Sequence, residues 1–506
     1  MLQRCMSLLA AAVFLSPLAL EAAGRGQLEI NVIDRDTQAP VAVRMKLRDQ
    51  RGKPVKPPKV PWLNDHFVFE GKIVLDLPAG AYTFDMERGP EYRTRGGSFQ
   101  LERDATDNKT VDMPRFFDMK KEGWWSGDLH VQRDPKQIDL LMRAEDLHLA
   151  PVVTWSNEPL TGIKPPPAAE GLLKLESQRF VNLLTGRDRR DAGELLFFHL
   201  PQPLPIAGVK GEIPPAGELF AQALSEANAH IDVARPYSWD LPVWVATGKV
   251  QSFEVFGDHI LREGTQPDPP GKPRDTVRFG GSQGMGRWSL DVYYQLLNCG
   301  LRIPPTAGSG SGLNSNPVGY HRVYVHCDEF TYDNWWQNLR AGRTVVTNGP
   351  LLQPRVNGEL PGHIFQADAG QAIDLNVSLN LGTREKIEYL EVVKDGKPIQ
   401  EVRLDEWAKN RGELPPVRFE ESGWLLVRVV TNNPDTFRGA ITAPYYVEIG
   451  YEKKISKRAA QFFLDWVVDR VKKLKIEDAA ERERVLAFHR AARDFWQKMV
   501  ADANAD

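Results

Sequence analysis

Histidines and carboxylates follow several apolar segments in the middle of the chain. Asp128 and His130 lie two residues apart in the segment 123–132, so on a strand their side chains would share one face. His199 ends the apolar run 195–198, and Asp258 and His259 follow the run 250–257. Where strands alternate with helices, polar residues at the carboxyl ends of strands form the sites. These residues are therefore candidates for metal binding and acid–base chemistry.

Three protein ligands and one open position suffice for a hydrolytic metal site. The predicted metal ligands are His130, His199, Asp232 and His259. Glu254 is predicted as a further ligand or general base, and Arg235 as the cation that binds an anionic substrate group. The expected ion is zinc, manganese or iron, with one ion or none. The alternative is structural: a histidine at a strand end often hydrogen-bonds a neighbouring backbone group, and Glu254 would pair with Arg235.

Four segments carry a resemblance to a known family. They are Gly-Trp-Trp-Ser-Gly-Asp-Leu-His at 123–130, Ala-Glu-Asp-Leu-His at 144–148, Arg-Pro-Tyr-Ser-Trp-Asp-Leu-Pro at 235–242 and Gly-Arg-Thr-Val-Val-Thr-Asn-Gly-Pro at 342–350. Residues 121–350 resemble the CehA/McbA branch of the polymerase and histidinol phosphatase (PHP) metallohydrolases. The resemblance implies a distorted βα barrel whose inward His, Asp and Glu bind up to three divalent metals and hydrolyse phosphoesters, amides or carbamates.

The chain departs from that pattern at several ligand positions. Gln132 stands where the family has a second histidine, residues 154–157 read Thr-Trp-Ser-Asn in place of Thr-Asp-His-Asn, and a Gly-Ser run fills 308–312. That run is either a mobile linker or a loop whose N–H groups could hold an anion. Two functions remain open: a hydrolase with a reduced metal site, acting on a phosphoester, amide or other ester, and a catalytically inactive barrel that binds glycans or cell-surface partners.

The surrounding sequence predicts a multidomain protein of α/β and β parts. Alternating strand and helix patterns over 119–350 predict βα units around a mostly parallel sheet or barrel. Short alternating strands over 27–118 predict a β-sandwich that resembles carboxypeptidase-regulatory or prealbumin-like modules, and the same pattern with a hairpin turn at Asp395-Gly396 predicts a second sandwich over 351–450. Residues 451–506 predict a helical tail, in which His489 serves packing or lies on the surface rather than binding a metal.

The N-terminus and the charge balance limit the partners. A charged start, an apolar core and small residues over 1–23 predict a secretory signal peptide, so we expect a periplasmic or extracellular protein. No later segment predicts a membrane span. The formal net charge of −3 provides no field that gathers nucleic acid. The expected partner is a small-molecule or glycan-type substrate, and the sequence leaves open both the oligomeric state and whether Cys299 and Cys327 pair.

Overall fold

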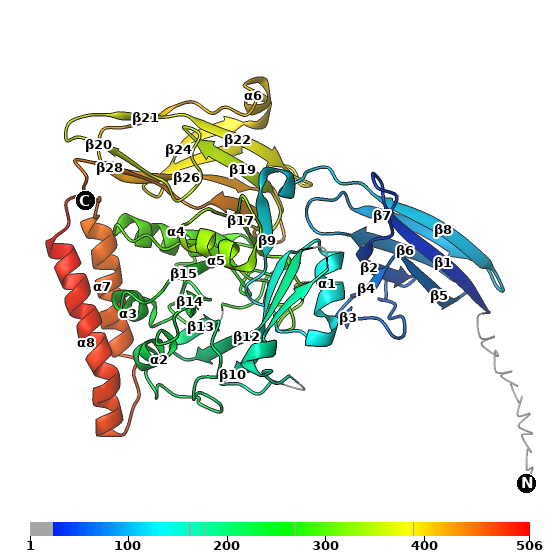
Figure 1. The fold of residues 1–506 in the computed structure, drawn as a ribbon, viewed down its shortest axis with the longest axis horizontal. Helices are drawn as coiled ribbons and strands as arrows, with labels where there is room; N and C mark the ends of the chain where they lie inside the picture. Colours follow the sequence, from blue (N-terminus) through cyan, green and yellow to red (C-terminus); the bar gives the residue numbers. More distant parts are fainter. Residues whose placement is uncertain (1–23, 161–162, 177, 269, 388) are drawn as a thin grey trace, which may run out of the picture.

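The computed structural model describes residues 24–506 except 161–162, 177, 269 and 388. The predicted signal peptide of residues 1–23 lies outside the described residues. Figure 1 shows the N-terminal β module (blue) on one side of the central α/β region (cyan to green). The C-terminal β module (yellow) lies along another side, and two long helices (red) lie against the face opposite the N-terminal module.

The N-terminal module consists of two sheets that face one another. Along β1 (Arg25–Asp34) buried and accessible residues alternate, which places Leu28, Ile30 and Val32 inside. They share one core with Met45 and Leu47 of the other sheet, which confirms the predicted β-sandwich. The first sheet adds β5 (Lys72–Pro78) and β8 (Thr106–Met113) to β1; the second contains β2 (Ala42–Asp49), β3 (Trp62–Leu63), β4 (His66–Glu70), β6 (Gly80–Glu87) and β7 (Arg95–Leu101).

The central region is a sheet with helices packed around it. Its strands are β9 (Trp124–Gly127), β10 (Leu149–Ser156), β11 (Leu172–Leu175), β12 (Arg179–Arg190), β13 (Gly193–Phe198), β14 (His230–Val233), β15 (Ser252–Phe256), β16 (Pro305–Ala307), β17 (Arg322–His326) and β18 (Thr344–Thr347). Its helices are α1 (Ile138–Ala144), α2 (Ala216–Ala223), α3 (Leu241–Ala246), α4 (Gly284–Asn298) and α5 (Tyr332–Arg340).

Strand direction in this sheet differs from the expectation. The pairs β9–β10, β10–β12, β14–β15 and β15–β16 are parallel, whereas β12–β13, β13–β14, β9–β17 and β17–β18 are antiparallel. The sheet is therefore mixed rather than mostly parallel. The reason is local: only Asp191 and Ala192 separate β12 from β13, and so short a connection can only form a hairpin.

The C-terminal β module continues the central sheet, because β18 pairs with β27. The hairpin predicted at Asp395-Gly396 is confirmed by the pairing of β23 with β24. The elements are β19 (Leu351–Val356), β20 (Ile364–Ala367), β21 (Ile373–Leu375), β22 (Val377–Gly382), β23 (Tyr389–Lys394), β24 (Lys397–Arg403), α6 (Leu404–Lys409), β25 (Val417–Phe419), β26 (Gly423–Val430), β27 (Gly439–Thr442) and β28 (Tyr445–Ile449).

The predicted helical tail consists of α7 (Lys457–Val471) and α8 (Ala479–Ala501), which lie side by side (Figure 1). Their apolar faces enter the central core, where Trp466 and Trp496 are fully buried. The indole N–H of Trp496 donates to the carbonyl of Pro242 in α3. The tail is thus part of the body of the molecule.

Two further features complete the fold. Cys299 and Cys327 are both buried and do not form a disulfide, so apolar cores and ion pairs hold the described parts together. Over the residues that the structure describes, no helix combines the length and the apolar character needed to cross a bilayer.

Candidate functional site

His130 lies at the centre of a buried polar cluster in the central region. It follows β9, and its ring is fully buried between two glutamates. Its Nε2 lies 3.4 Å from Oε1 of Glu194 in β13, and its Nδ1 lies 3.6 Å from Oε1 of Glu254 in β15. No side-chain nitrogen or oxygen of these three residues has a hydrogen bond of normal geometry. Buried polar groups are nearly always partnered, so this cluster is the strongest sign of a site.

Arginines provide positive charge beside Glu194. The Nε of Arg235 lies 2.8 Å from Oε2 of Glu194, and Nη1 of Arg187 lies 3.9 Å from Oε1. Arg235 also reaches Asp258, with Nη2 at 2.7 Å from Oδ2. Arg235 therefore bridges Glu194 and Asp258, which is a different pairing from the one with Glu254 that the structural interpretation expects.

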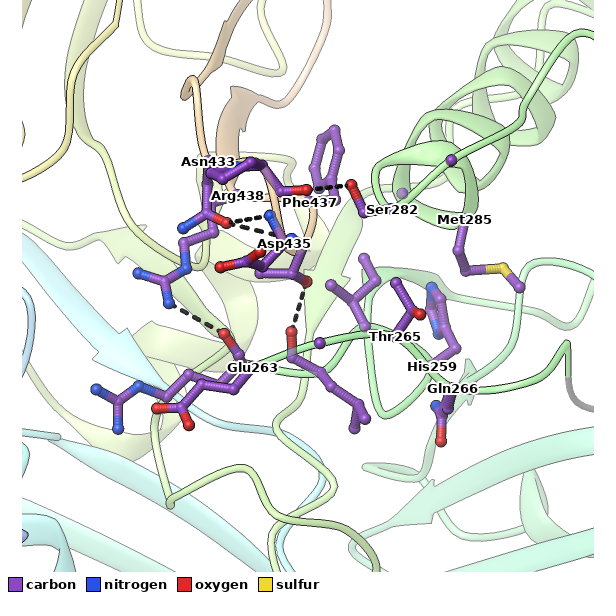
Figure 2. Close-up of a pocket in the computed structure, with 18 of the residues that line it drawn as sticks. His259, Glu263, Thr265, Gln266, Ser282, Met285, Asn433, Asp435, Phe437 and Arg438 are labelled. Atoms are coloured by element: carbon purple, nitrogen blue, oxygen red, sulfur yellow. Dashed lines mark hydrogen bonds between the residues drawn. The ribbon is translucent and has the colours of Figure 1, made fainter. Parts of the chain in front are cut away.

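His259 connects the cluster to a large cavity. It follows Asp258, and its ring packs edge-on against Tyr237 with the ring centroids 5.5 Å apart. The same histidine lines a cavity of about 750 Å³ between the segment 259–286 and the C-terminal module loop 433–438. Figure 2 shows His259 beside Thr265, Gln266 and Met285, across from Asn433 and Phe437. Hydrogen bonds from Ser282 to Pro434 and from Thr436 to Leu261 join the two walls.

The Gly-Ser run at 308–312 is a packed loop rather than a mobile linker, because Gly308 to Ser311 are buried. One N–H group of the run, that of Ser309, donates to a carboxyl group, the side chain of Asp128. Asp128 accepts hydrogen bonds from the backbone N–H of Ser309 at 2.8 Å, the hydroxyl of Ser309 at 2.6 Å and the backbone N–H of Gly319 at 2.6 Å. Asp128 thereby ties the loop to the end of β9.

Asp232, a predicted ligand, lies in β14 beside the cluster and is hydrogen-bonded on one oxygen. Its Oδ2 accepts from the hydroxyls of Ser252 and Thr306. Among the acids that surround Glu254, Asp232 is the one whose charge acts on it most strongly. It therefore contributes negative charge to the cluster, while two hydroxyls fix its orientation.

Burial controls the protonation of the cluster. Loss of hydration, together with the charges of neighbouring acids, raises the pKa of Glu254 well above its usual range. Burial also raises the pKa of Asp128 and of Asp232 to about 6, despite their hydrogen bonds. Burial lowers the pKa of His130, and lowers that of His259 to about 4. At neutral pH both imidazoles are therefore neutral, and the raised pKa of Glu254 favours its protonated form.

His199 lies in a different environment from the cluster. Its Nδ1 lies 2.9 Å from the carbonyl oxygen of Asn228 and its Nε2 lies 2.6 Å from the hydroxyl of Tyr332. A carbonyl only accepts, so Nδ1 carries the proton and Nε2 accepts from Tyr332. The ring then has no free lone pair for a metal. His199 contacts Trp336 of α5 instead.

Of the predicted residues, the structure thus brings together His130, Asp232, Arg235, Glu254 and His259, and gives His199 other partners. Glu194 was missed. Its sequence signal is a single charge within the apolar strand Gly-Glu-Leu-Leu-Phe-Phe at 193–198, because charged residues are almost never fully buried unless paired.

The donor atoms of the cluster suit a small divalent ion. Two ligands that share one ion with bonds near 2.1 Å lie about 3.4 Å apart in tetrahedral geometry, which is the separation of His130 Nε2 and Glu194 Oε1. Across residues 24–506, with the gaps named above, no group of three or more His, Cys, Asp or Glu is arranged to hold a metal. A third protein ligand would therefore require a side-chain movement, because Glu254 faces Nδ1 of the His130 ring rather than the Nε2 side on which Glu194 lies.

Comparison with known proteins gives little likeness. No protein-family model matches the chain, and no curated protein matches it. Among solved structures, the Bacillus anthracis TIE protein is 19% identical over 22% of this chain and 20% of its own, with a TM-score of 0.15. The pilus-presented adhesin Cpa is 9% identical over 19% of this chain and 28% of its own, with a TM-score of 0.14.

A calcium-binding mutant of Bacteroides uniformis β-glucuronidase 2 covers more of this chain, 81%, and 57% of its own, at 8% identity and a TM-score of 0.17. This chain therefore spans less than two thirds of each of these structures. At such TM-scores none of them defines the fold or the function of this protein.

Proposed function

We propose that this protein is an exported hydrolase with a single divalent metal ion, acting on a phosphoester, amide or other ester, and that the curved central sheet is a distorted βα barrel of the PHP type. The observation that carries the proposal is the fully buried cluster of His130, Glu194 and Glu254, in which no side-chain nitrogen or oxygen forms a hydrogen bond of normal geometry and only Glu194 is paired with arginine. His130, through Nε2, and Glu194 would hold the ion, while Glu254 faces Nδ1 of the same ring. A bound divalent ion lowers the pKa of water and stabilises a developing oxyanion.

Two further residues position the carboxylates and exchange protons. Arg235 fixes the carboxylates of Glu194 and Asp258 through its two ion pairs. His259, neutral at pH 7, faces the cavity and is the group placed to exchange a proton with a substrate.

The cavity lining indicates the class of substrate. Three arginines and three acids line it: Arg262, Arg274, Arg438, Glu263, Asp268 and Asp435. Met285 and Phe437 add an apolar wall. Balanced charge with one apolar wall favours a polar small molecule over a highly charged polymer.

A second function is a binding module that uses the same cavity without turnover. One observation favours it: Arg187 and Arg235 already place positive charge beside Glu194, where a hydrolase would use the charge of its metal.

Metal content separates the two functions. The full chain is purified, incubated with zinc, manganese or iron, desalted and analysed by inductively coupled plasma mass spectrometry. The hydrolase proposal expects one ion per chain, lost in Glu194→Gln and in His130→Gln. Glu448→Gln is the matched control, because Glu448 is also buried and paired with an arginine, Arg302, but lies in the C-terminal module; it should keep the ion.

Activity is then measured on p-nitrophenyl phosphate, bis-p-nitrophenyl phosphate and p-nitrophenyl acetate. Hydrolysis that follows metal content across these variants supports the hydrolase. Absence of metal in the wild type after all three incubations rejects it and leaves the binding module. Export is tested separately. N-terminal sequencing of the protein secreted by an expressing cell should show that the mature chain begins immediately after residue 23.

A further inference from the structure

A second, smaller cavity of about 80 Å³ lies where the three larger parts of the molecule meet. The N-terminal module contributes Arg44 and Glu87, the central region contributes Tyr320 and Arg322, and the C-terminal module contributes Arg384 and Arg438, among other residues. A single water needs roughly 10–15 Å³ by this measure, so the cavity has room for several waters or for one small tetrahedral ion.

The residues lining this cavity carry an excess of positive charge. Five arginines line it: Arg44, Arg262, Arg322, Arg384 and Arg438. The acids among its described lining residues are three glutamates, Glu87, Glu145 and Glu385. Ion pairs link the two sets, including Arg44 to Glu87 at 3.0 Å and Arg44 to Glu145 at 2.7 Å. With all three glutamates ionised, two positive charges remain uncompensated, and charges at a buried junction are costly unless they are paired.

Several hydrogen-bond donors at the cavity also have no acceptor. Nη2 of Arg322, Nε of Arg384 and Nε of Arg438 are buried and donate to no acceptor. The hydroxyl of Tyr320 is also buried without a partner. The guanidinium of Arg438 lies beside the same tyrosine and can only donate, so the hydroxyl proton itself faces no acceptor. All four residues line the same cavity, and each unsatisfied buried donor is unfavourable.

We propose that this cavity binds a small dianion, such as inorganic phosphate, sulfate or a short dicarboxylate. One dianion would balance the two excess charges and accept hydrogen bonds from the four unpartnered donors. Because those donors belong to the central region and the C-terminal module, the ion would hold these parts together. The ion would enter past the side chains of Arg384 and Arg438, which are 21% and 19% exposed. The inference is independent of the proposed hydrolase.

Tyr320→Phe tests the site, because it removes one hydroxyl whose proton has no acceptor and which lies beside the guanidinium of Arg438. Binding of inorganic phosphate, sulfate and succinate to the full chain is measured by isothermal titration calorimetry at constant ionic strength. We expect one saturable site per chain in the wild type and affinity about tenfold weaker in Tyr320→Phe, the effect of losing one hydrogen bond to a charged group. The control is Tyr293→Phe, a buried tyrosine bonded to Ile303 outside the cavity, which should bind with wild-type affinity.

The ligand that binds most tightly distinguishes an oxyanion from a dicarboxylate. The bound ion should also raise the melting temperature of the wild type and of Tyr293→Phe more than that of Tyr320→Phe. Absence of saturable binding of all three anions overturns the proposal. So does equal affinity in the wild type and Tyr320→Phe, since binding would then take place elsewhere, for example in the larger cavity, which Tyr320 does not line.

Discussion

Gly308 shows how tightly the residues around His130 are packed. A Cβ at this position would lie 2.3 Å from Cβ of His130 and 2.7 Å from Oε2 of Glu254. The backbone of Gly308 is not in the left-handed region, so the restriction is steric. We expect Gly308→Ala to destabilise the protein by about 1–3 kcal/mol, the usual cost of overpacking, measured by urea denaturation. If the proposed metal site exists, the variant should also lose metal.

Gly211→Ala is the matched control for that experiment. A Cβ added at Gly211 would have nothing within 4 Å, and this glycine is likewise absent from the left-handed region. Its free energy of unfolding should stay within about 0.5 kcal/mol of the wild type. Equal stability of the two alanine variants would contradict the close contact between the Gly-Ser loop and His130.

The candidate site was partly predictable from sequence at this scale. Strand alternation and strand ends predicted His130 and His259, which follow β9 and β15, together with Glu254, which lies within β15, and the structure places all three near one another. The strand-end rule fails at His199, where φ is 66°. A residue in the left-handed region turns its side chain away from the direction that an extended strand would give it. Glu194 lies inside β13, as Glu254 lies inside β15, and its single charge within an apolar run was the only local sign of it.

At the scale of elements, an ion-pair network attaches α7 to the central region. Arg470 contacts Asp240 and Glu212, both at 2.5 Å, and its own side chain is 4% exposed. Removing the cation leaves the largely buried Glu212 without its ion pair and Asp240 with His489 alone, whose Nε2 lies 3.6 Å away. Breaking a buried pair of this kind costs about 3–5 kcal/mol. We therefore expect Arg470→Ala to lower the free energy of unfolding by that amount in urea denaturation followed by tryptophan fluorescence, since Trp466 and Trp496 lie in this interface.

Arg484 provides the comparison, because it joins α8 to α2 through Glu218 at 2.7 Å but is 48% exposed. Exposed pairs contribute at most about 1 kcal/mol, so Arg484→Ala should change stability little. A large loss in both variants would indicate that the tail is held by charge in general rather than by the buried pair.

The elements themselves were mostly predictable, whereas their pairing was not. Hydrophobic periodicity correctly indicated the N-terminal sandwich, the helices α7 and α8 and the β23–β24 hairpin, because these depend on local spacing. Strand direction depends on which strands meet in space. The short link between β12 and β13 was the one local sign of antiparallel pairing, and the continuation of the central sheet through β18 into β27 joins residues about a hundred positions apart.

At the scale of the whole molecule, buried histidines in two different modules couple stability to pH. Burial lowers the pKa of His66 to about 4, although Asp65 opposes this shift, and lowers that of His148 to about 3. In the unfolded chain both titrate near 6.5. As the pH falls below about 6.5, the unfolded state binds protons that the folded state does not, so these two residues destabilise the fold progressively down to about pH 4 and pH 3.

The total pH dependence also contains the opposite effect of Asp128 and Asp232, whose raised pKa values let the folded state take up protons first. The contribution of a single residue to this pH dependence is therefore obtained by comparing the free energies of unfolding of the wild type and of a variant at that residue. The free energy of unfolding of the wild type minus that of His66→Gln should fall by about 3 kcal/mol between pH 7.5 and pH 4. A fall of this size follows when folding lowers the pKa of one histidine from about 6.5 to about 4. Urea denaturation at pH steps across this range measures it. His363→Gln, at a ring 38% exposed, is the surface control. A pH-independent difference for His66→Gln would mean that the pKa of His66 is the same in the folded and unfolded states.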